Sequence, residues 1–180
     1  KKLGIYRIAN CNHADAEVYM DSVHYKLNVG CADCHLPIVE DKTGTRYRSH
    51  DSSKSVLNSK ASMQYRLGCH TSDKVKTVKD MVAYVRNAQK SVAEKDAAVA
   101  KKQDETFDLL KVAIEGKKLD EKAINEAKFK YAVAAYYKEF VYGNRGATPG
   151  EKVAHNPEKN RRYLEKALSV LDEAQTILKN

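Results

Sequence analysis

Hydrophobic residues recur with helical spacing in the second part of the chain, from Asp73 to Gly116. They return at steps of three, four, seven or eight residues, which places them on one stripe of an α-helix. The stripe consists of Val78, Met81, Val82, Val85, Val92, Val99, Phe107, Leu110 and Ile114. Because Gly116 ends the pattern, the sequence predicts one helix of about 42 residues, on the order of 60 Å long. A helix of this length is expected to pack against a second copy of the chain as well as against its own chain.

Two more helices are predicted after Gly116. Asp120 is a favourable N-cap for a helix that ends at Gly143. Its apolar face consists of Ala127, Tyr131, Ala134 and Phe140. In the last helix Asn156 is the N-cap, Pro157 is the first helical residue, and Glu158 complements the positive helix end. Its apolar face consists of Leu164, Leu168, Leu171, Ala174 and Leu178.

The first part of the chain has a different character. Residues 1–72 contain all four cysteines and five of the six histidines, and stretches such as EDKTGTRYRSHDSSKS show no clear period. We therefore predict an all-α protein with two regions that pack as one unit. A loop-rich region over residues 1–72 binds a cofactor, and a long-helix region over residues 73–180 forms the dimer contact.

Composition agrees with a helical protein. The 180 residues are 42% apolar and 31% charged, with no Trp, three Pro and eight Gly. The formal charge of +8 is spread along the expected helix faces among Asp and Glu, which favours solvated helix surface over nucleic-acid binding. No run of 18 apolar residues occurs, so no membrane span is expected. The opening KKLGIYRIAN lacks a signal-peptide pattern, so either a leader has been removed or the chain begins partway along a longer precursor.

The run GCADCHLP, residues 30–37, contains the motif C-x-x-C-H at Cys31, Cys34 and His35. In c-type haem attachment two cysteines form thioether bonds to the vinyl groups, and the adjacent histidine binds iron. Half of a zinc site, which needs two more ligands, and a thioredoxin-type redox pair, which needs a βαβ context, are the alternatives. A large apolar cofactor would also order a region that has little apolar periodicity of its own.

Cys69 and His70 repeat the end of this motif, but Arg66 stands where the second cysteine is expected. One thioether and one axial histidine can still hold a haem, so two haem c groups are expected on this chain. The alternative is a reduced buried thiol beside a surface histidine. Cys11 remains, and it could pair with Cys69 in a disulfide, lie buried, or supply the missing thioether.

Low-spin haems that transfer electrons take a second axial ligand from a distant position. His24, His50 and His155 are the candidates, and the alternative for each is a solvated or capping histidine. A ligating imidazole is expected to direct its other ring nitrogen to a carbonyl or carboxylate.

The order of these parts resembles the C-terminal part of the ammonia-forming cytochrome c nitrite reductases, over roughly residues 8–178. The similarity is carried by three segments, which are CNHADAEVYMDSVHYKLNVGCADCHLPIVEDKTGTRYRSH, CHTSDK before a long helix, and AHNPEKNRRYLEKAL. The resemblance implies a periplasmic multihaem oxidoreductase that is a homodimer through its long helices and receives electrons from a redox donor protein.

The resemblance also implies roles for the histidines. His35 and His155 would bind one iron, and His70 and His24 the other. His50, after Ser49, would bind a haem that this chain does not attach. His13 matches the family's active-site histidine, in a His-Pro-Glu run that here reads His-Ala-Asp, and it would help to bind a small anion such as nitrite.

Several departures from the family limit these expectations. The catalytic haem of the family is bound through C-x-x-C-K, which this chain lacks. The family's Lys-x-Gln-His run reads Asn10-Cys11-Asn12-His13, so a calcium ion is only a weak expectation. The chain is therefore expected to supply electron-relay haems to a catalytic haem on another segment or chain in the six-electron reduction of nitrite to ammonium. The alternatives are a multihaem electron carrier without turnover and a helical haem-based sensor or scaffold.

Overall fold

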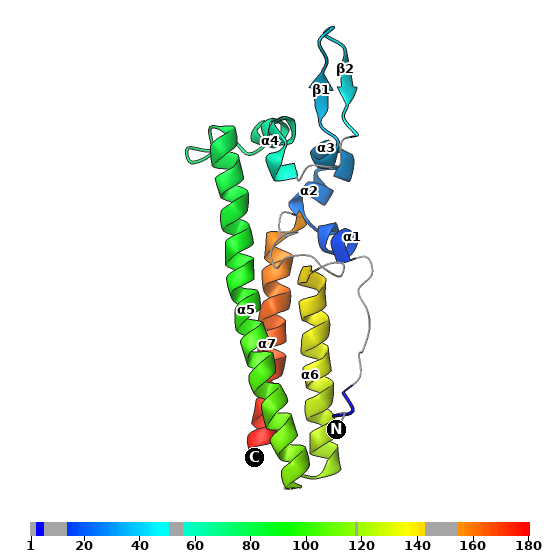
Figure 1. Cartoon of the computed structure of the whole chain (residues 1–180), viewed down its shortest axis with the longest axis vertical. Helices are drawn as coiled ribbons and strands as arrows, with labels where there is room; N and C mark the ends of the chain where they lie inside the picture. The colour runs from blue at the N-terminus through cyan, green and yellow to red at the C-terminus, as the bar shows by residue number, and fades with distance from the viewer. Residues whose placement is uncertain (1–2, 6–13, 51–55, 118, 143–154) are drawn as a thin grey trace. The chain divides into compact units, whose positions relative to one another are not determined.

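The computed structural model describes residues 3–5, 14–50, 56–117, 119–142 and 155–180. The fold is mainly helical, as predicted (Figure 1). Its elements in chain order are α1 (Ala14–Tyr19), α2 (Val23–Lys26), α3 (Cys31–His35), β1 (Ile38–Glu40), β2 (Arg46–Arg48), η1 (Val56–Asn58), α4 (Lys60–Leu67), α5 (Val78–Gly116), α6 (Glu121–Tyr142) and α7 (Pro157–Lys179).

The chain divides into two compact units by its internal contacts. The larger unit combines residues 1–20 with residues 89–180, and the smaller unit consists of residues 21–88. Helix α5 begins in the smaller unit and ends in the larger one. The division predicted at residue 72 separates the cysteine-bearing part from the long helices by composition, and it stays a prediction.

Helix α5 begins later than the sequence pattern predicts, at Val78 rather than at Asp73. Thr77 and Asp80 form a reciprocal cap that sets this start. The Asp80 carboxylate accepts the Thr77 backbone N–H at 2.8 Å, and the Thr77 hydroxyl accepts the Asp80 backbone N–H at 3.2 Å. Such a capping box satisfies N–H groups that the first helical turn leaves unpaired.

The predicted N-caps of the other two long helices are confirmed. The Asp120 carboxylate accepts the backbone N–H of Ala123 at 2.7 Å at the start of α6. The Asn156 side-chain oxygen accepts the backbone N–H of Lys159 at 3.0 Å, and Pro157 is the first residue of α7. These residue types are favoured at helix starts for this reason.

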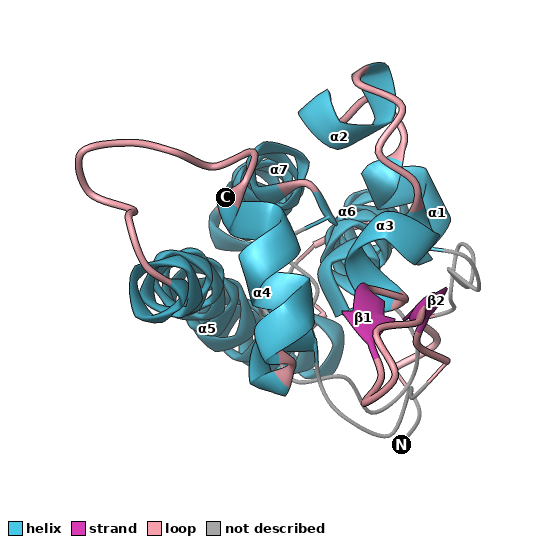
Figure 2. Ribbon diagram, turned by 90° about the horizontal axis from the view of Figure 1, so that it is seen from above, coloured by secondary structure: helices cyan, strands magenta, loops and turns pink. Residues whose placement is uncertain are grey.

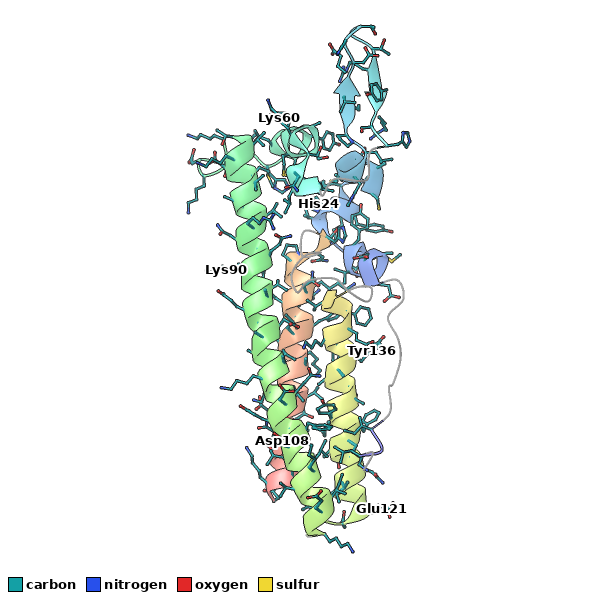
Figure 3. The ribbon with its side chains drawn as sticks, in the orientation of Figure 1. His24, Lys60, Lys90, Asp108, Glu121 and Tyr136 are labelled. Atoms are coloured by element: carbon teal, nitrogen blue, oxygen red, sulfur yellow. The ribbon has the colours of Figure 1, made fainter. Side chains whose placement is uncertain are left out.

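Helices α6 and α7 pack along each other in the larger unit, and α5 lies beside both (Figure 1). Lys90 is on the face of α5 that points away from α6 and α7 (Figure 3). The buried side chains follow the predicted stripes closely, because the amphipathic faces of three helices exclude water from one core. This core includes Val92, Val99, Leu110, Ala127, Ala134, Leu164, Leu171 and Ala174.

Polar contacts fix the register between α5 and α7. The buried Gln175 amide donates to the Thr106 hydroxyl at 3.0 Å, and that hydroxyl donates to the Lys102 carbonyl oxygen at 2.7 Å. Nearer the start of both helices, two ion pairs also join them, Lys95 with Glu165 and Lys102 with Asp172. A buried polar pair favours one register because sliding the helices would leave both groups unsatisfied.

The smaller unit contains short elements in the region predicted to be loop-rich. Strands β1 and β2 form an antiparallel hairpin in which Val39 pairs with Tyr47. The Asp41 carboxylate closes the turn by accepting the backbone N–H groups of Thr43 at 2.8 Å and Thr45 at 3.0 Å. Figure 2 shows this hairpin in magenta. Strands of three residues are too short for a periodic pattern to reveal them.

None of the helices in the described part of the chain has the length and apolar character needed to cross a membrane.

We predict that Leu110→Ala lowers the free energy of unfolding by about 2–5 kcal/mol, because Leu110 is fully buried and the variant leaves a cavity. Val112→Ala on the same helix is the matched control, because Val112 is 68% exposed, and it should change this free energy by less than about 0.5 kcal/mol. Urea denaturation followed by helical circular dichroism measures both. Equal effects of the two variants would contradict the described core.

Candidate functional site

The C-x-x-C-H run forms the five-residue helix α3. Gly30 precedes it with extended backbone, and the Asp33 carboxylate accepts the Gly30 backbone N–H at 2.8 Å. Residues three apart on a helix lie on the same side, so Cys31 and Cys34 share one face, and His35 follows directly. Cys31 and His35 are exposed and Cys34 is half-buried, and both thiols are free.

Arg48, at the end of strand β2, connects the hairpin to helix α3 by hydrogen bonds. Its guanidinium donates to the carbonyl oxygens of Ala32 at 3.2 Å and Leu36 at 3.1 Å, and to the Asp33 carboxylate at 3.0 Å. The hydrogen bond from the Gly30 backbone N–H is the largest cause that holds the pKa of Asp33 below its usual value, and the hydrogen bond from Arg48 is the next largest. One arginine therefore binds both the carbonyl end of the helix and the carboxylate between the two cysteines.

His24 and His70 lie side by side although they are 46 residues apart in the sequence. Their Nε2 atoms are 3.5 Å apart, and their ring planes are inclined by 66°. His24 belongs to α2 (Figure 3), which the Ser22 hydroxyl caps by accepting the Tyr25 backbone N–H at 3.0 Å. Burial is the largest cause that lowers the pKa of His24, and the charges of His70 and Arg66 lower it further. This favours the neutral imidazole, which is the form that binds a metal.

The end of helix α4 sets the position of His70. The Arg66 carbonyl oxygen accepts the backbone N–H groups of Cys69 at 3.0 Å and His70 at 2.9 Å, so the helical turn continues past Leu67. The ring of Tyr84, on α5, lies 5.9 Å from the His70 ring between centroids. Cys69 is an exposed free thiol beside this histidine.

Tyr65 connects the two cysteine-bearing segments. Partial burial first, and then the negative charges of Asp33, Cys69 and Cys34, raise the pKa of its phenol. Helices α3 and α4 are in contact, which is consistent with this shared electrostatic environment. The C-x-x-C-H helix and the Cys69-His70 pair are therefore neighbours in the smaller unit.

Large apolar side chains of the smaller unit are exposed on the elements that carry these groups. They are Val23, Tyr25, Leu27, Ile38, Tyr47, Tyr65 and Tyr84. Exposed apolar surface of this extent in a small unit indicates that something covers it. An apolar ring system such as a porphyrin is compatible with these exposed apolar side chains, the free thiols and the imidazole pair. Among the described residues no group of three or more His, Cys, Asp or Glu could hold a metal ion.

His155 directly precedes the N-cap of α7 in the larger unit. Its Nδ1 atom lies 3.5 Å from a carboxylate oxygen of Asp15 on α1. Helix α1 is held in place by Val18, which packs against Phe140, and by its Glu17 carbonyl oxygen, which accepts from the Lys159 ammonium at 2.7 Å. Tyr136, on α6 in Figure 3, belongs to the same aromatic cluster. Asp15 therefore lies within ion-pair distance of this ring.

The other predicted site residues are placed as follows. His50 follows strand β2 and is exposed. His13 and Cys11 lie outside the described residues, so their predicted roles stay predictions. The sequence analysis missed the roles of Asp33, Arg48 and Tyr84. Gly30 and Asp33, three residues apart, form a recognisable helix-cap pattern in the sequence. Arg48 and Tyr84 have no such pattern nearby in the sequence, because each reaches the site only through the tertiary fold.

Comparison with known proteins agrees with this chemistry. The family model described as cytochrome c552 matches residues 1–180. Cytochrome c-552 of Haemophilus ducreyi is 50% identical over 38 residues, and the matched segment covers 21% of this chain and 8% of that protein's length. The resemblance drawn from the sequence is thereby confirmed. The chain belongs to the cytochrome c552 family, whose members are c-type cytochromes related to nitrite reductase with haem c as the cofactor.

Proposed function

We propose that this chain carries two haem c groups and relays electrons to a catalytic haem on another segment or chain of a nitrite-reducing assembly. The observation that carries the proposal is the imidazole pair of His24 and His70, 3.5 Å apart, beside a C-x-x-C-H helix. Bound haem supplies one-electron changes of its iron, and this chain's residues attach, orient and shield it.

The first haem would be attached by Cys31 and Cys34, with His35 as an axial ligand. The cap by Asp33 and the three hydrogen bonds of Arg48 keep the two thiols on one face of α3. The resemblance gives His155 as the second axial ligand. His35 belongs to the smaller compact unit and His155 to the larger one, so their binding of one iron stays a prediction.

The second haem would be attached by Cys69 alone, with His70 and His24 on opposite sides of the iron. Their Nε2 atoms, 3.5 Å apart, would be the nitrogens that hold the iron. Arg66 excludes a second thioether from its own position in the motif.

Nitrite reduction by the complete assembly follows from the family relation and belongs to this proposal. His50 would bind a haem of another segment, and His13 would help to hold the anion. A homodimer through the long helices, a periplasmic location and a redox donor protein come from the same resemblance. A calcium site is not part of the proposal, because the matching residues differ.

A second candidate function is a multihaem electron carrier without turnover. These 180 residues contain no C-x-x-C-K motif, which holds the catalytic haem in the related enzymes, so turnover would need that motif from another segment or chain.

Intact mass under denaturing, reducing conditions tests the attachment. The chain produced in a host that matures c-type cytochromes should carry two covalent haems. Cys31→Ser/Cys34→Ser should remove one and Cys69→Ser the other, because each variant removes the thioether bonds of one site. Cys11→Ser is the control and should retain both. Full haem mass in either site variant would refute the assignment.

Ligand binding tests the imidazole pair. His24→Ala should leave one iron without its second axial ligand, so the reduced protein should bind carbon monoxide at about one site per chain, whereas the parent chain should not. His50→Ala is the matched control and should leave carbon monoxide binding unchanged. An unaltered spectrum in His24→Ala would mean that His24 is not a ligand.

A nitrite assay with a chemical electron donor separates the two functions. The chain alone should form no ammonium. The chain assembled with a segment that bears C-x-x-C-K should form it, and Cys69→Ser should slow this reaction at least tenfold by breaking the relay. Equal rates with and without the Cys69 haem would contradict the relay, and an inactive assembly would favour the electron carrier.

A further inference from the structure

Arg66 occupies the position in the second motif where an attachment cysteine is expected, three residues before Cys69. Its carbonyl oxygen accepts the backbone N–H groups of both Cys69 and His70. The backbone of Arg66 is therefore directly joined to the imidazole-bearing turn, and its side chain starts from the same turn as the thiol.

The Arg66 side chain is only half-exposed, and its Nε atom is buried without a hydrogen-bond partner in the described structure. Among the residues that the structure describes, no ion pair involves Arg66. A guanidinium remains charged at all ordinary pH values, so this position carries a permanent positive charge. Partial burial strengthens the field of this charge on nearby groups.

Arg66 and His70 are four residues apart and joined by a helical backbone hydrogen bond of 2.9 Å, so their side chains lie on the same side of this turn. The neighbouring carboxylate of Asp33 does not offset this charge, because it is bound by Arg48 and by the Gly30 backbone N–H. In contrast, Arg48, which donates to the C-x-x-C-H helix, is paired with that carboxylate. The two attachment sites therefore differ in local charge.

We infer that Arg66 raises the reduction potential of the haem held between His24 and His70 relative to the same site without this charge. The inference rests on the proposed function. Reduction adds one electron from a mediator to ferric iron and lowers the positive charge at the iron by one unit. A fixed cation beside the ligands disfavours the ferric form more than the ferrous form, so the equilibrium moves toward reduction.

The missing thioether supplies a spectroscopic label for this haem. A vinyl group that has not reacted with a cysteine stays conjugated with the porphyrin and moves the absorption of the reduced haem to longer wavelength. The haem at Cys69 can therefore be followed separately from the haem at Cys31 and Cys34 in one sample.

The test is a spectroelectrochemical titration of the full haem-loaded chain. Arg66→Gln should lower the reduced-to-oxidised ratio of the long-wavelength haem about tenfold at fixed potential, which is ~59 mV for one electron. Arg66→Lys should keep most of the parent value because it keeps the charge. Lys60→Gln, at the opposite end of α4 (Figure 3), is the matched control and should leave both haems unchanged.

Arg66→Cys is a second variant that removes the charge while restoring the covalent anchor, so it should load even if Arg66→Gln does not. It should abolish the long-wavelength label, so the midpoints of both haems are read from one summed titration, in which one midpoint should be lower than in the parent chain. Two loaded haems with an unmoved potential in these charge-removing variants would overturn the inference and leave the proposed function standing. An equal shift in Arg66→Lys would overturn it as well. A parent chain with one haem would overturn both.

Discussion

The close approach of two imidazoles is the constraint on which the smaller unit depends. His24 and His70 come from helix α2 and from the end of α4, and burial lowers the pKa of His24. Two neutral imidazoles can share only one hydrogen bond. The free energy of that bond offsets only a small part of the cost of removing two rings from water. In the proposed site an iron ion would use both lone pairs. The capped turn of α2 and the Arg66 carbonyl contacts set the positions of the two imidazoles.

Apolar packing of three helices organises the larger unit. Its three helices bury complementary stripes, and the contact between Gln175 and Thr106 fixes how far α7 is displaced along α5. The same packing has a functional result at the start of α7. It holds α1 against the aromatic cluster around Phe140, which places Asp15 beside Nδ1 of His155.

Two arginines beside the cysteines illustrate how one residue type serves opposite purposes. The Arg48 guanidinium donates to two carbonyl oxygens and pairs with the Asp33 carboxylate, so its charge has a partner and its hydrogen bonds connect β2 to α3. Arg66 has a buried Nε without a partner in the described structure, so its charge stays available to act on the nearby ligands. Under the proposed function, the first arginine would orient an attachment helix and the second would act on the haem ligands.

The long helices, their caps and the attachment chemistry follow from the order of the amino acids, whereas the meeting of distant groups does not. Periodicity and cap residues are local, so Gly116, Asp120 and Asn156 could be assigned from the chain alone, and C-x-x-C-H is a local motif in the same sense. The sequence pattern placed the start of α5 five residues too early. The capping box of Thr77 and Asp80 begins the helix at Val78 instead. Two contacts join segments that are far apart in the sequence. They are the contact of His24 with His70 and the hydrogen bonds from Arg48 to α3. No periodic signal encodes such contacts, because they arise when separate elements bury their surfaces against one another.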